Sequence, residues 1–128
     1  MADGPKGVMW RTQRKVSGVG FKLLDMEDST TIASVESPQG RIVRLTQAKW
    51  AYIQRHSEMR GELELLLSAI RAPDFQEPDP RPGRERYWLR TQPPFPFGWL
   101  RAVVQFEGDV DRLITAFGQD NEPDGLPK

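Results

Sequence analysis

The stretch that decides the fold runs from Thr46 to Asp74 and reads TQAKWAYIQRHSEMRGELELLLSAIRAPD. The hydroxyl of Thr46 can accept hydrogen bonds from the free amides of a first helical turn. Leu45, just before this cap, can pack on Trp50 one turn later as a hydrophobic staple. The pattern therefore predicts a helix that begins after Thr46 and runs to about Met59.

A second helix is expected after Gly61, because apolar residues recur there at spacings of three and four and form one stripe. The stripe consists of Leu63, Leu66, Leu67 and Ile70. Pro73 ends this helix, since proline lacks the amide that a continuing helix needs.

Strand patterns flank the two helices. Residues 16–35 alternate loosely between apolar and polar side chains, as in one or two strands of a hairpin. The turn signal at 37–40 suggests that residues 30–36 and 41–45 pair. Downstream, the Pro-rich, charged stretch 77–83 is expected to be a loop. Three more strands should follow it, over 84–91, 99–107 and 110–117.

Helices that are separated from strands along the chain indicate an α+β domain with its helices on one face of a sheet. The expected order is an N-terminal strand or hairpin, two helices, and a curved antiparallel sheet of three to four strands. A single domain should span residues 16–118. Residues 1–15 and 119–128 are expected to be flexible, because they hold few residues that a core could bury.

Composition excludes several classes of site. The chain has 128 residues, 18 basic and 18 acidic side chains, one histidine and no cysteine. Disulfides, thiolate zinc sites and cysteine nucleophiles are therefore excluded, and no metal or other cofactor is expected. The zero net charge argues against polyanion binding through the overall field, which leaves only a local patch. Without a signal-peptide pattern or a membrane span, we expect a cytoplasmic protein with no membrane partner.

His56 is the first candidate for chemistry, because an imidazole can accept and donate a proton near neutral pH. It lies late in the first predicted helix. Position alone favours a simpler interpretation, in which His56 is a surface residue stabilised by the negative end of the helix dipole.

The second candidate is the basic cluster of Arg81, Arg84, Arg86 and Arg90, which only Glu85 opposes between residues 81 and 90. Side chains alternate along a strand, so one face would carry Arg84, Arg86, Trp88 and Arg90. Guanidinium groups can grip phosphate, and an indole can stack on a base. The alternative is an ordinary solvated strand face, with Tyr87 and Leu89 on the buried side.

Thr115 is the third candidate, since it is a lone hydroxyl in an otherwise apolar strand. Its simpler interpretation is the common preference of threonine for strands. The sequence holds no phosphate-binding glycine loop, no nucleophile-elbow motif and no pair of carboxylates at metal-ligand spacing on a helix.

Several of these residues occur together in one known pattern between residues 39 and 117. The pattern consists of Arg44-Leu45-Thr46, Trp50, Ile53, Arg55 to Met59, Ile70, Pro73-Asp74, Arg84 to Arg90, Val103-Val104 and Ile114 to Phe117. In this order the residues resemble the phage and bacterial domains grouped as barnase–EndoU–colicin–RelE-like nucleases.

The resemblance implies two helices followed by a curved antiparallel sheet, and it implies cleavage of RNA without a metal ion. His56 matches the helix histidine of that family, Arg84 to Arg90 its basic strand, and Thr115 its last-strand hydroxyl. Ser57 departs from the usual proline, which can alter how His56 leaves the helix. Gly118-Gln119 replaces the usual tail, which puts the placement of Thr115 in doubt.

The resemblance and RNA chemistry together give each residue a hypothetical role. His56 would act as general base or acid, and Arg86, with Arg84 or Arg90, would stabilise the phosphorane. Tyr87 and Thr115 would donate hydrogen bonds or relay protons. The products would be a 2′,3′-cyclic phosphate and a 5′-hydroxyl. The residues expected to bind RNA are Arg55, Arg84, Trp88 and Arg90.

Two other functions remain open. The first is a non-catalytic module on the same fold that binds protein or RNA, for which the aromatic, Pro-rich stretch 93–99 could serve as a docking loop. The second is a toxin whose arginines are covered by a protein inhibitor or antitoxin.

Overall fold

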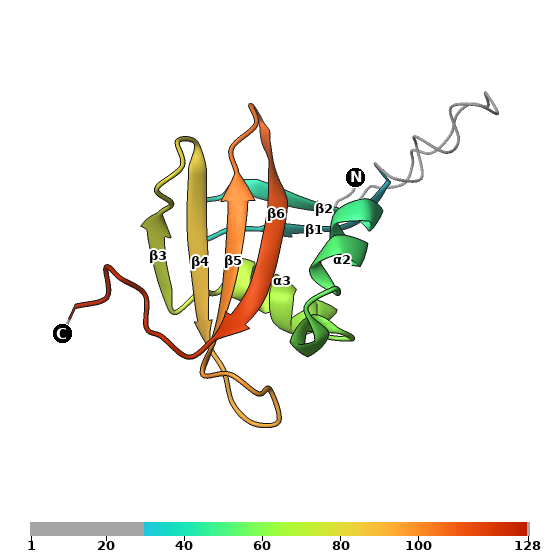
Figure 1. Cartoon of the computed structure of the whole chain (residues 1–128). Coiled ribbons are helices and arrows are strands. Elements are labelled where there is room, and N and C mark those ends of the chain that lie inside the picture. Colours follow the sequence, from blue (N-terminus) through green and yellow to red (C-terminus); the bar gives the residue numbers. More distant parts are fainter. Residues whose placement is uncertain (1–29, 128) are drawn as a thin grey trace.

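A six-stranded sheet with helices packed against it organises the chain (Figure 1). The structure is a computed structural model, and it describes residues 30–127. The strand pattern at 16–29 and the flexible segment expected at 1–15 lie outside the described residues. The elements are β1 (Thr31–Glu36), β2 (Ile42–Thr46), α2 (Gln47–Ile53), the 3-10 turn η1 (Ser57–Met59), α3 (Leu63–Arg71), β3 (Phe75–Pro78), β4 (Arg84–Arg90), β5 (Trp99–Gln105) and β6 (Val110–Gln119).

The strands lie in the order β1-β2-β6-β5-β4-β3. The α+β class is confirmed, but the expectation of three to four antiparallel strands is wrong. β3 to β6 form an antiparallel meander, while β2 pairs with β6 in parallel. The N-terminal hairpin therefore joins the main sheet, and the sheet is mixed.

A partly buried ion pair helps to hold the hairpin beside β6. The Nε and Nη2 atoms of Arg41 each donate to one carboxylate oxygen of Asp111 over 2.6 Å. Asp111 is fully buried. The hydrogen bond to Asp111 raises the pKa of Arg41. This ion pair helps to explain why β2 pairs with β6. No local sequence pattern indicates it, because Arg41 and Asp111 lie far apart along the chain.

The first helix is shorter than its pattern predicts. Thr46 caps it as expected, accepting a hydrogen bond from the Lys49 amide over 3.3 Å. The helix ends at Ile53, and His56 adopts an extended backbone before the short turn η1. This break lets Met59 enter the core, where it is fully buried.

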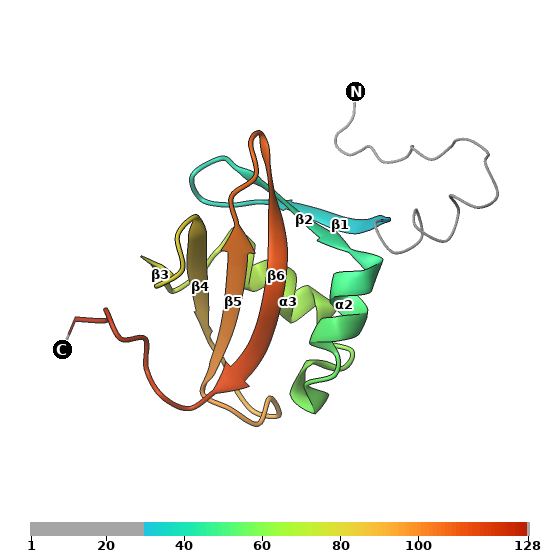
Figure 2. The same ribbon diagram turned by 45° about the horizontal axis from the view of Figure 1, so that its top comes forward.

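The second helix follows its prediction closely. α3 buries Leu66, Ala69 and Ile70 against the sheet. Figures 1 and 2 both show α3 behind the sheet, where it contacts β4 and β5, so the opposite face of these strands carries no helix in the described part of the chain. None of the helices among residues 30–127 is long and apolar enough to cross a membrane.

β3 and the C-terminal segment differ from the sequence-based expectation. Phe75–Pro78 pairs with β4, although Glu77 and Pro78 were expected to begin a loop. β6 extends to Gln119, and the segment after it was expected to be disordered. Within that segment Pro123 is buried, and the Gly125 amide donates to Glu77 Oε1 over 3.0 Å. The described part of the tail thus lies against the edge strand.

Candidate functional site

The helix-free face of the sheet brings together side chains from three strands. Directly paired residues in neighbouring strands project to the same face. Arg86 of β4 pairs with Val103 of β5, which pairs with Thr115 of β6. In a neighbouring row, Arg101 pairs with Phe117. The sequence-predicted residues Arg86 and Thr115 therefore share one face.

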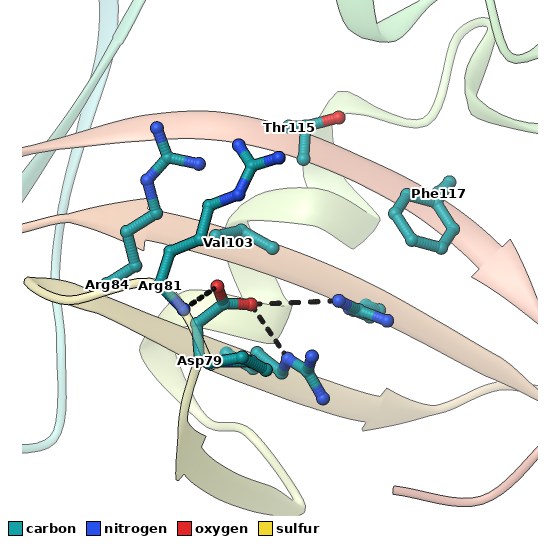
Figure 3. Close-up of a pocket in the computed structure, with 9 residues that line it drawn as sticks. Asp79, Arg81, Arg84, Val103, Thr115 and Phe117 are labelled. Atoms are coloured by element: carbon teal, nitrogen blue, oxygen red, sulfur yellow. Dashed lines mark hydrogen bonds and ion pairs between the residues drawn. The ribbon is translucent and has the colours of Figure 1, made fainter.

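These side chains line a pocket of about 280 Å³ (Figure 3). The loop between β3 and β4 forms one wall, and β4, β5 and β6 form the floor. The lining residues are Asp79, Pro80, Arg81, Arg84, Arg86, Arg101, Val103, Thr115 and Phe117. Four arginines face one aspartate, so the pocket has an excess of positive charge and suits an anionic ligand.

Arg86 is held in the pocket wall by carboxylates. Its Nε donates to Asp79 Oδ1 over 2.9 Å, and its Nη1 donates to Glu77 Oε2 over 3.4 Å. The exposed Asp124 of the tail lies 3.9 Å from Nη1. Glu77 also accepts the indole N–H of Trp88 over 3.0 Å. Arg86 is therefore neutralised, and it orders the surrounding groups.

Asp79 joins the loop to the sheet. Its carboxylate accepts from Arg86 and from the amide of Arg81, and it lies 3.7 Å from Nη2 of Arg101. Burial alone would raise the pKa of Asp79, but its hydrogen bonds and these cations hold it below its usual range. Burial lowers the pKa of Arg101, and the neighbouring charge of Arg86 acts in the same direction.

Arg81 and Arg84 are the more available cations of the pocket. The Nε of Arg84 donates to Gln105 over 2.8 Å, and neither arginine forms an ion pair within residues 30–127. Figure 3 shows both side chains extending toward the Thr115 side of the pocket. They can offer guanidinium donors to a phosphate there.

His56 is not among the lining residues, but it lies beside Phe117, which lines the pocket. Its ring centroid is 5.6 Å from that of Phe117, with the two planes tilted by 43°. Two residues further on, Glu58 Oε2 accepts the backbone N–H of Gly118 over 2.8 Å. This bond ties η1 to the free edge of β6. His56 is exposed to solvent.

Tyr87 does not join the site. It lies on the opposite face of β4, in the core beneath the helices, and is 1% exposed. Burial raises its pKa. Alternation along β4 places Tyr87 behind the strand when Arg86 faces the pocket, so the expected partnership of Tyr87 with Thr115 is wrong.

Of the four residues expected to bind RNA, only Arg84 lines the pocket. Trp88 shares its face but is 1% exposed, with the guanidinium of Arg101 5.5 Å from its ring, so it has no free surface for a base. Arg90 stacks on Trp99 over 4.3 Å, away from the pocket lining. Arg55 is exposed on the helical layer beside Tyr52.

Two lining residues that can bind or orient a ligand, Asp79 and Arg101, were not singled out from the sequence. Strand alternation and the hairpin register could have placed Arg101 opposite Trp88. Asp79 and Arg81 lie in a stretch expected to be loop, and nothing in their spacing indicates that the loop folds over the sheet.

Among residues 30–127, no three histidine, aspartate or glutamate side chains converge as a metal site would require. No protein-family model, curated protein or solved structure matches the chain. The function is therefore argued from the site itself.

Proposed function

We propose that this chain is an endoribonuclease of the barnase–EndoU–colicin–RelE-like type, which cleaves RNA without a metal ion. One observation carries the proposal. The single histidine, His56, packs on Phe117, and Phe117 lines the same cationic pocket as Arg101 and Thr115. A proton-transfer group thus lies next to one wall residue of a pocket that holds a hydroxyl and guanidinium donors, which are the groups that cleavage of a phosphodiester needs.

The reaction needs these groups in distinct roles. His56 takes the proton of the ribose 2′-hydroxyl as its oxygen attacks the adjacent phosphorus. The P–O5′ bond breaks, and the 5′-oxygen takes a proton from water and leaves as a hydroxyl, while His56 returns its proton to the solvent. The other product is a 2′,3′-cyclic phosphate. Arg81, Arg84 and Arg101 stabilise the negative charge on the phosphorane, and Thr115 can donate a hydrogen bond to it.

Arg86 acts differently in this scheme from its sequence-based role. Two carboxylates already occupy its guanidinium, so it positions Asp79 and through it Arg101. The direct contacts to phosphate come from Arg81 and Arg84 instead. Arg90, as the sequence-based alternative to Arg84, lies outside the pocket lining.

The decisive experiment is an RNA cleavage assay in the presence of a chelator. We expect end-labelled RNA to be cut to products that end in a 2′,3′-cyclic phosphate. His56→Ala should lower kcat by about a hundredfold or more. Arg71→Ala is the control, because Arg71 is exposed at the end of α3 in the helical layer.

Two results would overturn the proposal. The first is equal cleavage by the His56→Ala protein and the parent. The second is cleavage of RNA in which every 2′-hydroxyl is methylated, because that substrate has no internal nucleophile.

A binding module without catalysis is the second candidate, and the neutralised Arg86 favours it. Intact RNA that migrates slowly in a gel would support this function. The stretch 93–99, a candidate docking loop for such a module, is packed instead: Phe95 is buried and stacks edge-on against Phe97.

If the nuclease is a toxin, an inhibitor would cover Arg81 and Arg84. Expression of the toxin would then arrest growth unless His56 were replaced.

A further inference from the structure

Two arginines outside the pocket lie side by side on its face of the sheet. Arg44 of β2 pairs directly with Arg112 of β6 across the parallel junction. Their neighbours Val43 and Asp111 are buried on the opposite face, so both arginines project to the helix-free face. Neighbouring strands lie about 4.8 Å apart, which makes these two positive charges close neighbours.

Little in the described structure compensates this pair of charges. Arg44 forms no ion pair among residues 30–127. Arg112 meets Glu107 over 2.9 Å, but both side chains are more than a third exposed, so the ion pair contributes little net energy. The Nε atoms of Arg44 and Arg112 are shielded from solvent and have no hydrogen-bond partner.

Like charges directly opposite each other in a sheet are destabilising. The arrangement becomes favourable when an anion lies between the two guanidinium groups, because they then share its charge. Planar guanidinium donors match phosphate oxygens in particular.

The arginine pair is continuous with the pocket. On β6 and β5, Arg112 pairs with Gln105, and Gln105 pairs with Arg84, which lines the pocket and donates to the Gln105 side chain. A row of polar and cationic side chains thus crosses four strands, from β4 to β2. It runs across the sheet, as an extended chain of phosphates would.

We propose that Arg44 and Arg112 form a second phosphate subsite, which binds a neighbouring phosphate of the RNA whose scissile phosphate occupies the pocket. This inference rests on the proposed function, because only that function identifies the phosphate-bearing ligand as RNA. It narrows the substrate class to RNA with at least two successive phosphates. A mononucleotide or a dinucleoside monophosphate cannot fill both positions.

Binding of an uncleavable RNA tests the subsite independently of catalysis. The probe is a fluorescent oligonucleotide methylated at every 2′-hydroxyl, titrated with the full chain over a series of salt concentrations. Each phosphate contact contributes about 0.7 to the slope of log affinity against log salt for a single strand. We expect the double variant Arg44→Gln, Arg112→Gln to lose about that much slope and about tenfold in affinity.

Two matched variants separate the subsite from general charge and from folding. Arg71→Gln removes one positive charge from the helical layer and should keep the parent's slope. Arg44→Lys with Arg112→Lys keeps both charges and should restore most of the slope. A double glutamine variant with the parent's slope would overturn the subsite, as would a control that loses as much.

Cleavage gives a second measurement. If the subsite is correct, the double glutamine variant should lose about ten times more kcat/KM on a long RNA than on a dinucleoside monophosphate. A parent that binds the probe through these arginines but cuts no RNA would refute the proposed nuclease and leave the subsite intact. Normal cleavage with an unchanged salt slope would refute the subsite alone.

Discussion

Asp79 links the pocket's charge to the stability of the fold. Its bonds to Arg86 and to the amide of Arg81 hold its pKa below the usual value of 3.8. A carboxyl group whose pKa is lowered on folding stabilises the folded state at pH values above its usual pKa. The stabilisation is lost as the pH falls through the lower pKa of the folded state.

We therefore expect Asp79→Asn to be less stable than the parent near neutral pH by about 1 to 2 kcal/mol. The difference should begin to shrink below about pH 3.8, where the carboxyl group of the unfolded chain takes up a proton, and should vanish once the pH is below the lower pKa of the folded state. Urea unfolding at both pH values measures it. Glu64→Gln, at an exposed position of α3, serves as the control. A difference that stays constant with pH would contradict the assigned pKa direction.

Tyr87 and Thr115 give a paired prediction, because they lie on opposite faces of the sheet. Tyr87→Phe should cost about 1 kcal/mol of stability through the lost hydroxyl and leave RNA cleavage within about twofold of the parent. Thr115→Val should lower the cleavage rate about tenfold, since its hydroxyl lines the pocket. Unfolding and cleavage measured on both proteins separate the two roles. If Tyr87→Phe lowered the cleavage rate more than Thr115→Val did, the catalytic hydroxyl would lie on the opposite face of the sheet, and the prediction would be wrong.

At the scale of elements, η1 is docked through one hydrogen bond from the Gly118 amide to Glu58. Glu58→Ala removes the acceptor, so η1 should loosen from the edge of β6 and His56 should lose its fixed place. We expect kcat to fall about tenfold with a smaller change in KM. Glu58 is a positioning residue, so the pH profile of the remaining activity should keep the parent's shape.

The conservative variant Glu58→Gln keeps an acceptor and should restore most of that activity. Failure of this rescue, combined with a shifted pH profile, would indicate that Glu58 itself takes part in proton transfer.

Local sequence patterns predicted the elements that depend on local physics. The Thr46 cap, the apolar stripe of α3 and the strand at 84–90 all follow from neighbouring residues, and the structure confirms them. β3 was missed because four residues that include Glu77 and Pro78 form a strand only when β4 is beside them. The early end of α2 likewise goes with long-range contacts, because the residues after it bury Met59 in the core and place Glu58 against Gly118, 60 residues away.

The candidate site was likewise predictable only where it depends on local strand alternation. Alternation put Arg84 and Arg86 on one face, and it equally put Tyr87 on the other, which the family resemblance overrode. The sequence could not show that Asp79 and Glu77 neutralise Arg86, because those contacts require the loop and β3 to fold against β4. Arg81 gains its importance from the same tertiary contact.

At the scale of the whole molecule, the C-terminal segment braces the edge of the sheet. Truncation after Asn121 removes the Gly125 amide that donates to Glu77, and it removes the buried Pro123. Because Glu77 also holds the indole of Trp88, we expect redder tryptophan emission and a loss of about 1 kcal/mol in stability. A truncation after Gly125 retains both contacts and is the control. Identical spectra for the two truncated chains would show that the segment does not brace β3.

The position of β6 has a consequence for how the chain matures on the ribosome. β6 is the last strand to be synthesised, yet it lies in the middle of the sheet and bonds to both β2 and β5. The N-terminal hairpin must wait through the synthesis of more than 60 residues before its parallel partner exists. Thr115 and Phe117 also emerge with this strand. A nascent chain therefore has no complete pocket until the residues up to Phe117 have left the exit tunnel.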